Sequence, residues 1–296
     1  MNPVLITGAN GALGLATARQ LLARNVPVLL TCRRLESAYA AREQLDADVR
    51  VAELDVSDLA SVRRLAASAC PLGGLVCNAG IQIVSGTRRT HAGVEETFAT
   101  NHLGHFLLAR SLLPALDSGA RVVFVASNTH DPKRCTGMPA PMLADLHAVA
   151  SGSAFAEESA DLAGRRRYTT SKLCNVLCAY ELAKRLPSSP WSTLQVVAFD
   201  PGLMPGTGLA REYGPVASWA WRNVMPAATA VVPNVNTVNK SAARLAAVVL
   251  GELASEGGYV SKGKLERSSA ESYDQDLARE LWELSSKLAG VPSALA

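Results

Sequence analysis

A short apolar segment at residues 4–7 runs directly into the turn Thr7-Gly8-Ala9-Asn10-Gly11-Ala12-Leu13-Gly14, and an amphipathic stretch follows at residues 13–23. Glycines in such a turn let the backbone bend tightly and approach a pyrophosphate, while the amides that begin the helix face the anion. A glycine pattern alone would also fit a plain tight turn, but this one joins a first strand to a first helix. The turn therefore predicts a dinucleotide-binding domain. Its candidate cofactor contacts are Gly8, Asn10, Gly11, Leu13 and Gly14.

Short apolar runs and longer amphipathic stretches alternate along most of the chain. Strands are expected at residues 4–7, 28–31, 49–54, 75–77, 121–126 and 194–199, and helices at residues 13–23, 35–45, 59–67, 95–116 and 168–186. Unbroken apolar runs are typical of parallel strands that helices cover on both faces. We therefore expect an α/β fold with a doubly wound, mostly parallel Rossmann sheet and with ligands at the carboxyl ends of its strands.

Two segments interrupt this alternation, and we expect both to be functional insertions in a single domain that spans residues 1–296. Residues 128–167 form a long connection with several prolines and glycines, and residues 203–239 are rich in Pro, Gly and Trp. Connections of that length are usually lids or disordered. We expect the second to close over a bulky lipophilic substrate, although a subunit contact or a peripheral membrane contact would use the same side chains. The candidate contacts are Trp219, Trp221, Val224, Met225, Pro226, Arg211 and Arg222.

Charge and cysteine content narrow the class of partner and the compartment. The 29 Lys and Arg residues against 26 Asp and Glu give a net charge of +3, too little for a concentrated nucleic-acid-binding face. The six cysteines have no CxxC spacing, which favours a reducing cytoplasm. The first apolar run is interrupted at once by Gly8, unlike an export signal, and prolines and asparagines within residues 223–239 disfavour a membrane span. We expect a cytoplasmic monomer or homodimer with a small-molecule partner.

The end of the second expected strand bears on which dinucleotide binds. NAD-binding domains usually carry Asp or Glu there to accept hydrogen bonds from the ribose hydroxyls, but this chain has Arg33 and Arg34. Guanidinium groups make paired, charge-assisted hydrogen bonds to a 2′-phosphate. These residues favour NADP(H), unless they only begin a solvated helix and Glu36 binds the ribose instead.

Tyr168 and Lys172 are four residues apart in an expected helix and therefore share one face. A free phenol with a pKa of about 10 is a poor base at neutral pH, and lowering that pKa by ~3 requires roughly 4 kcal/mol from nearby positive charge. The Lys172 ammonium and an oxidised nicotinamide would together supply this stabilisation. A Tyr-x-x-x-Lys spacing also occurs by chance, so the pair gains weight only from its context.

The order of these motifs resembles the short-chain dehydrogenase/reductase family. The resemblance rests on Thr7 to Gly14, Asp55-Val56, Asn78-Ala79-Gly80, Asn101, Ser127, Tyr168 to Lys172 and Asp200-Pro201-Gly202. It implies that Tyr168 is the acid/base and Ser127 orients the substrate oxygen, while Lys172 binds the nicotinamide ribose and Asn101 holds a water of the proton relay. It also implies cofactor contacts at Asp55, Val56, Asn78, Ala79, Gly80, Pro201 and Gly202. Taken singly, Asp55, Asn78, Asn101 and Ser127 would be interpreted as turn, capping or strand-ending residues.

Two details refine the resemblance. Ala12 stands where most members with this active site have glycine, so the spacing Gly8, Gly11, Gly14 is similar to that of an extended branch, and cofactor binding survives if residue 12 has a helical φ. A narrower resemblance is to the group that holds retinol dehydrogenases and light-dependent protochlorophyllide reductases. It rests on residues 98–108, on the insert at residues 128–167, and on the segments around Cys174 and Trp282. Gly80 and much of the insert depart from the photoenzyme.

Other polar side chains on the expected helices are assigned to packing or to the pocket. Cys174 lies about 240° around the helix from Tyr168 and is expected to pack, whereas Asn175 returns to within roughly 20° and is a candidate for lining the pocket. His102 and His105 are three residues apart but have no third ligand at suitable spacing, so we expect them to pack between helices and to bind no metal.

The predicted activity is reversible hydride transfer between NADP(H) and a carbonyl or alcohol carbon of a bulky lipophilic substrate. Two alternatives stay open: a protochlorophyllide-type photoreductase, which would need light, and an NADP(H)-binding sensor without chemistry. The complete set of Asn101, Ser127, Tyr168 and Lys172 argues against the sensor.

Overall fold

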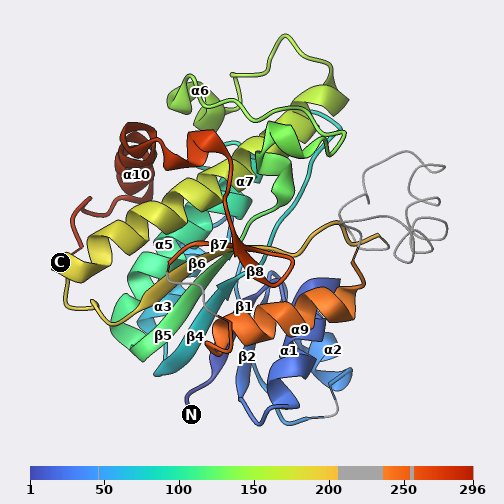
Figure 1. The fold of residues 1–296 in the computed structure, drawn as a ribbon, viewed down its shortest axis with the longest axis vertical. Coiled ribbons are helices and arrows are strands. Elements are labelled where there is room, and N and C mark those ends of the chain that lie inside the picture. The colour runs from blue at the N-terminus through green and yellow to red at the C-terminus, as the bar shows by residue number, and fades with distance from the viewer. Residues whose placement is uncertain (46, 206–235, 254–256, 296) are drawn as a thin grey trace.

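The computed structural model describes residues 1–45, 47–205, 236–253 and 257–295, and an eight-stranded sheet runs through them (Figure 1). Its strand order is β3-β2-β1-β4-β5-β6-β7-β8, and every neighbouring pair is parallel except β7 with β8. The strands are β1 (Val4–Thr7), β2 (Val28–Cys32), β3 (Arg50–Glu53), β4 (Leu72–Cys77), β5 (Leu116–Val125), β6 (Gln195–Asp200), β7 (Tyr259–Ser261) and β8 (Lys264–Glu266). The doubly wound, mostly parallel sheet is therefore confirmed.

Helices cover both faces of this sheet (Figure 1). One face carries α1 (Ala12–Leu22), α2 (Leu35–Glu43) and α9 (Val238–Val249), and the other carries α3 (Leu59–Ala67), α5 (Gly104–Leu112), α7 (Ala160–Arg185) and α10 (Gln275–Ala289). Shorter helical segments are α4 (Glu96–Phe98), η1 (Ala99–Leu103), η2 (Leu113–Ala115), η3 (Asn128–His130), η4 (Pro132–Arg134), α6 (Leu146–Ser151), η5 (Leu186–Ser188) and η8 (Ala270–Tyr273). No helix of the described part is both long and apolar enough to cross a membrane.

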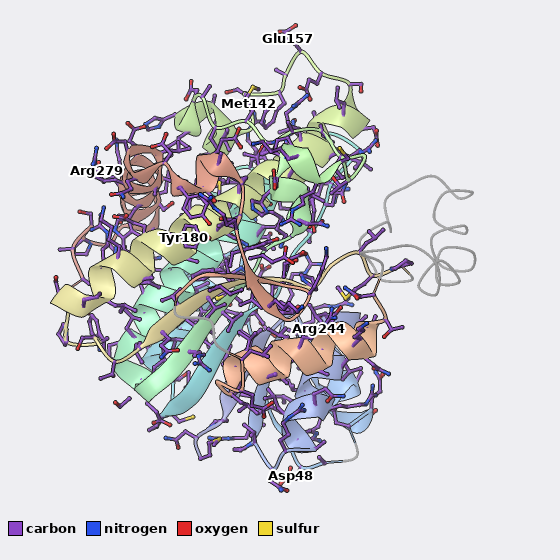
Figure 2. The ribbon with its side chains drawn as sticks, viewed as in Figure 1. Asp48, Met142, Glu157, Tyr180, Arg244 and Arg279 are labelled. Carbon is purple, nitrogen blue, oxygen red and sulfur yellow. The ribbon has the colours of Figure 1, made fainter. Side chains whose placement is uncertain are left out.

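Two apolar cores lie between these layers, because successive strand residues point to opposite faces of the sheet. Leu5 belongs to the core under α5, α7 and α10, and the next residue, Ile6, belongs to the core under α1 and α9. Trp282 of α10 packs into the first core, where the centres of its ring and the Phe106 ring lie 4.8 Å apart in an edge-to-face arrangement. Charged residues such as Asp48 and Glu157 lie on the outside of the molecule (Figure 2).

The insert at residues 128–167 is more ordered than the sequence suggested. It contains η3, η4 and α6, and α7 already begins at Ala160, where the Ser159 side chain accepts a hydrogen bond from the Leu162 amide. Gly164 does not break this helix. A Cβ there would lie 2.0 Å from the Ile83 carbonyl oxygen, so this glycine permits close packing of α7 against the segment after β4.

Other elements also differ from the expected ranges. The helix expected at residues 95–116 is divided into α4, the π-helical η1, α5 and η2, and β5 begins at Leu116, five residues before the expected strand. Strands β7 and β8 were not predicted, because three-residue strands carry little pattern of their own. Helices α9 and α10 were not predicted either, although they are 12 and 15 residues long. Most of the expected lid, including Trp219, Trp221, Val224, Met225, Pro226, Arg211 and Arg222, lies outside the described residues.

Candidate active site

The glycine-rich turn has the geometry that a bound dinucleotide requires. Gly8 has φ +62°, and a Cβ there would lie 2.9 Å from the Ala79 Cα, so only glycine fits without displacing the backbone. A Cβ at Gly14 would lie equally close to the Ala9 Cα. Ala12 is the first residue of α1, which gives it the helical conformation on which the expectation depended.

The start of α1 can accept an anion. Gly11 is its N-cap, no side chain of the described residues caps it, and its first turn holds no acidic residue. The first amides of a helix have no partner within the helix and carry a partial positive charge. With Asn10 and Gly11 exposed and Leu13 buried beneath them, the residues present fit a pyrophosphate at this place.

A set of hydrogen bonds ties this turn to the end of β4. The Thr7 Oγ1 accepts from the amides of Asn78 (2.8 Å) and Ala79 (2.9 Å), and the Asn78 Nδ2 donates to the Thr7 carbonyl at 2.8 Å. Because each bond is buried or partly buried, the two strand ends are held in one arrangement. Asn78 and Ala79 therefore fix the carboxyl ends of β1 and β4 relative to each other.

His105 connects this turn to Asn101. Its Nδ1 lies 3.1 Å from the Asn101 carbonyl oxygen, which only accepts, so Nδ1 carries the proton and Nε2 accepts from Thr7 Oγ1 at 2.8 Å. Burial lowers the pKa of His105 to about 4, which keeps the ring neutral at pH 7. The sequence assigned His105 to helix packing. It is packed, and it also carries a polar connection that no residue spacing reveals.

Asn101 lies in the π-helical segment η1, where an extra residue in the turn redirects side chains. Its Oδ1 accepts from the Ile81 amide at 2.8 Å, and its Nδ2 donates to the Ile81 carbonyl at 3.0 Å and to Ser171 Oγ at 2.9 Å. A Cβ at Gly80 would lie 3.4 Å from Asn101 Oδ1 and 3.7 Å from Lys172 Nζ. Gly80, Asn101 and Lys172 therefore meet at one point.

Tyr168 and Lys172 lie on the face of α7 that packs toward β5. The Lys172 Nζ is 5.5 Å from the centre of the Tyr168 ring and donates to the Val125 carbonyl at 2.9 Å. Only 7 % of Tyr168 and 4 % of Lys172 is exposed. Burial lowers the pKa of the Lys172 ammonium to about 8, and the carboxylate of Asp200 opposes that shift. Lys172 is therefore charged at pH 7 and lies close to the phenol.

Ser127 follows β5 by two residues, near the strand carbonyl that receives Lys172. Its Oγ accepts from the Thr129 amide at 3.3 Å and from the Thr129 hydroxyl at 3.1 Å, so the side chain begins η3. His130 Nδ1 donates to the Ser127 carbonyl, and His130 Nε2 accepts from the Ser269 amide at 3.1 Å. Burial lowers the pKa of His130. His130 was not singled out in the sequence, where nothing but its closeness to Ser127 marks it.

The remaining cofactor candidates lie at neighbouring strand ends. Arg33 and Arg34 follow β2 and are exposed, and Arg34 is the N-cap of α2. In the order β2-β1-β4-β5 they are three strands from Ser127, about 14 Å at the usual strand spacing. Asp55 Oδ1 accepts from the Ser57 amide (2.9 Å) and hydroxyl (2.7 Å), and Val56 is buried beside it. Arg33 and Arg34 are thus well separated from the residues around Tyr168. An extended dinucleotide requires such a separation between the residues that bind its two ends.

Pro201 and Gly202 follow β6. Gly202 has φ +76°, and its amide donates to Asp200 Oδ1 at 2.9 Å. The Pro201 carbonyl accepts from Ser241 Oγ at 2.6 Å and from Asn236 Nδ2 at 3.1 Å. These hydrogen bonds therefore hold in place the backbone of Pro201 and Gly202, the residues that the resemblance assigns to the nicotinamide pocket.

Two neighbouring candidates on α7 are buried. Cys174 is completely buried in the core, and burial raises the pKa of its thiol, in agreement with the packing role. Asn175 shares the Val125 carbonyl with Lys172 (3.3 Å from its Nδ2) and is only 1 % exposed; its role in lining the pocket stays a prediction. His102 is also buried, with Nε2 2.9 Å from Ser285 Oγ, and no group of three or more metal-binding side chains occurs among the described residues.

The chain is similar to known oxidoreductases along its length. The family model for short chain dehydrogenases matches residues 2–137. A protochlorophyllide reductase from Avena sativa is 34% identical over 97% of this chain and 99% of its own length. The structure of an uncharacterized protein from Mycobacterium Paratuberculosis is 30% identical, with a TM-score of 0.67 over 98% of this chain and 94% of that one.

The fold is shared with more distant members. A short-chain dehydrogenase/reductase structure from Burkholderia multivorans with bound NADP is 18% identical, with a TM-score of 0.59 over 90% of this chain and all of that one. Identity above 30% to a whole relative, the family match at the nucleotide-binding half and the strand order agree with one another. The chain therefore belongs to the short-chain dehydrogenase/reductase family of oxidoreductases, near the protochlorophyllide reductases.

Proposed function

We propose that this chain transfers a hydride between NADP(H) and a carbonyl or alcohol carbon of a bulky lipophilic substrate. The observation that carries the proposal is the buried pair of Tyr168 and Lys172, with the ammonium 5.5 Å from the phenol ring. Ser127 stands at the adjoining strand end, and Asn101 joins α7 through Ser171. A protein that only bound the nucleotide would have no use for a phenol whose pKa a neighbouring ammonium lowers.

In the proposed reduction, bound NADPH supplies the hydride. Tyr168 gives its hydroxyl proton to the carbonyl oxygen as that oxygen becomes an alkoxide, and Ser127 Oγ donates a hydrogen bond to the same oxygen. Lys172 stays protonated at pH 7 and stabilises the phenolate that Tyr168 leaves behind. In this proposal Asn101, whose Nδ2 donates to Ser171 Oγ at 2.9 Å beside Gly80, holds a water that returns the proton.

NADP(H) is the cofactor that we assign. The exposed guanidinium groups of Arg33 and Arg34 at the end of β2 can pair with a 2′-phosphate, and the uncapped start of α1 can receive the pyrophosphate. The Burkholderia neighbour carries NADP on the same fold. The contacts at Gly8, Asn10, Gly11, Leu13, Gly14, Asp55, Val56, Asn78, Ala79, Gly80, Pro201 and Gly202 belong to this proposal.

The test is a screen of lipophilic aldehydes, ketones and alcohols in darkness, following nicotinamide absorbance with NADPH and with NADH. We expect turnover that Tyr168→Phe abolishes, with NADPH affinity changed less than threefold. Arg33→Ala should weaken NADPH about tenfold and NADH hardly at all, as loss of a charge-assisted bond predicts. Comparable turnover by the Tyr168→Phe enzyme would refute the assignment, and equal loss for both nucleotides would leave Arg33 a helix-starting role.

The Avena sativa relative supports a second candidate, light-dependent reduction of a protochlorophyllide-type double bond. Illumination decides between the two candidates, because the first needs none. Nucleotide binding without turnover in light or darkness would indicate an NADP(H) sensor instead.

The proposal places this catalytic unit in a single domain over residues 1–296, with residues 203–239 closing over the substrate. We propose a reducing cytoplasm as its compartment, because all six cysteines are unpaired. The unit would act as a monomer or a homodimer, and sedimentation with and without NADPH distinguishes the two.

A further inference from the structure

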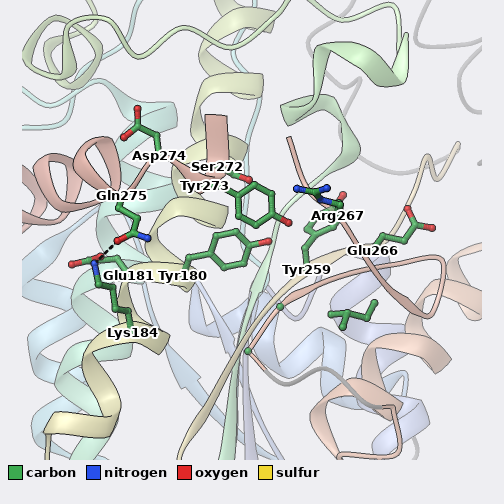
Figure 3. Close-up of a pocket in the computed structure, with 13 residues that line it drawn as sticks. Tyr180, Glu181, Lys184, Tyr259, Glu266, Arg267, Ser272, Tyr273, Asp274 and Gln275 are labelled. Atoms are coloured by element: carbon green, nitrogen blue, oxygen red, sulfur yellow. Dashed lines mark hydrogen bonds between the residues drawn. The ribbon is translucent and has the colours of Figure 1, made fainter. Parts of the chain in front are cut away.

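A cavity of about 580 Å³ opens between the second half of α7, η8 and the β7–β8 hairpin (Figure 3). It reaches the amino end of β7 at Gly257 and Gly258, whereas the proposed active site uses the carboxyl ends of the strands. Tyr180 lines the cavity twelve residues after Tyr168 on α7, which is about 18 Å along the helix. The cavity is therefore separate from the site of hydride transfer, and its volume is that of a small-molecule site.

Tyrosine rings form much of its wall. Tyr180 and Tyr273 are stacked with ring centres 5.5 Å apart and planes inclined by 27° (Figure 3). The Tyr180 hydroxyl is 2.7 Å from Ser268 Oγ, and the Tyr273 hydroxyl accepts from the Ser268 amide at 3.3 Å, so both rings are held from their polar ends. Tyr273 is 46 % exposed and Leu265 is 54 % exposed. A fixed aromatic surface beside an exposed leucine favours a flat apolar ligand.

The carboxylates that line the cavity are already engaged. Glu181 pairs with Arg185 at 2.7 Å, and Glu266 pairs with Arg134 at 2.9 Å. Asp274 accepts from two amides of the first turn of α10, at 3.0 Å each. Two of these three negative charges are therefore paired with arginines outside the cavity, and the third, Asp274, caps the amino end of α10.

The two cations that line the cavity have only neutral contacts. Lys184 donates to Gln275 Oε1 at 3.0 Å, and the Arg267 guanidinium lies 5.8 Å from the centre of the Tyr273 ring. Within the described ranges neither makes an ion pair. Because they come from α7 and from the segment after β8, they place positive charge on two sides of the cavity, against the single carboxylate, Asp274, that has no cationic partner in the described part of the chain.

We propose that this cavity is a second small-molecule site, which takes a planar aromatic ring system bearing a carboxylate. The rings of Tyr180 and Tyr273 would contact the flat body, and Lys184 or Arg267 would pair with the carboxylate. A salt bridge to a cation that currently contacts only a neutral amide or a ring adds charge complementarity without breaking an existing ion pair. The site is independent of the proposed activity and needs no turnover.

Isothermal titration calorimetry of the full chain with 2-naphthoate tests the proposal, with saturating NADPH present so that the nucleotide edge is filled. We expect one 2-naphthoate per chain, and at least tenfold weaker binding of 2-naphthylmethanol and 2-naphthylmethylammonium, which keep the ring and lose the negative charge. Affinity that falls with added salt would support pairing with the cations. Absence of 2-naphthoate binding, or equal affinity for all three compounds, would overturn the proposal.

Variants locate the binding. Lys184→Gln and Arg267→Gln, both in exposed side chains, should each weaken 2-naphthoate about tenfold, and Tyr273→Ala should do the same by removing the stacked ring. Lys287→Gln, an exposed lysine near the other end of α10, is the matched control and should bind normally. Unchanged affinity in all three variants would put the ligand elsewhere. Concentration-dependent dimerisation that blocks 2-naphthoate would identify a second copy of the chain as the occupant and would also refute the proposal.

Discussion

Lys172 is expected to make the protein less stable, so its replacement by methionine should stabilise the fold while ending turnover. Lys172 is 4 % exposed, and burial lowers the pKa of its ammonium from 10.5 to about 8. Each tenfold change in a protonation equilibrium is about 1.4 kcal/mol, so the charge costs about 3 kcal/mol of folding free energy at pH 7. Methionine removes that cost and loses one hydrogen bond to Val125, about 1 kcal/mol, although Asn175 still donates to the same carbonyl. The net gain expected for Lys172→Met is about 2 kcal/mol at pH 7.

The sign of the pH dependence follows from the lowered pKa. Below about pH 8 both the folded and the unfolded chain carry the charge, and the full cost applies. Between about pH 8 and 10.5 the unfolded chain holds the extra proton, so the stability contributed at this site rises with pH and the advantage of the variant disappears by about pH 10.

Urea unfolding of the nucleotide-free protein and of Lys172→Met at pH 7 to 10, followed by circular dichroism, measures this difference directly. Other groups titrate in both proteins and cancel. Lys184→Met replaces an exposed lysine of the same helix and should change the unfolding free energy by less than about 0.5 kcal/mol at every pH. If Lys172→Met is less stable than its parent at pH 7, or if the difference is constant with pH, then buried charge is not the cost that we infer.

Three further predictions concern the turn, the core and the thiols. Gly8→Ala forces a Cβ to 2.9 Å from the Ala79 Cα at φ +62°, so we expect about 2 kcal/mol lower unfolding free energy and weaker NADPH binding by fluorescence titration. Gly119→Ala, also at positive φ but with no atom within 4 Å, should bind NADPH normally, and equal loss would contradict the clash. Trp282→Ala should lower the unfolding free energy by about 3–5 kcal/mol because the ring is fully buried, and a loss below about 1 kcal/mol in urea would refute that. With Ellman's reagent, only the accessible Cys135 and Cys70 should react in the native protein, and fast reaction of a third thiol would show that a buried cysteine is reachable.

The nucleotide half of the fold is largely readable from residue order. The runs that become β1, β2 and β6 are unbroken and apolar, so their burial on both faces follows from local pattern. The elements β7 and β8 escape that reasoning, because three-residue strands carry almost no period and exist through pairing with β6 and with each other. The start of α7 at Ala160, inside the expected insert, also depends on tertiary contact, because the absence of a Cβ at Gly164 admits the Ile83 carbonyl.

The candidate site also combines features that local sequence predicts with contacts that only folding creates. That Tyr168 and Lys172 share a face follows from helical spacing alone. That Asn175, on the same face, is almost completely buried and shares the Val125 carbonyl with Lys172 depends on how closely α7 packs on β5. The connections made by His105 to Thr7 and by His130 to Ser127 join residues brought together only by folding.

By itself, the order of residues determined a dinucleotide-binding sheet, an oxidoreductase family and the residue types available for proton transfer, because strand burial, tight turns and helix faces are local properties of a chain. Only the tertiary structure decided which of those groups lie near one another, how deeply Lys172 is buried, and that Lys184 and Arg267 line one cavity with only neutral groups as their contacts. The burial of a side chain and its choice of ion-pair partner depend on segments distant in sequence, so no local pattern can encode them.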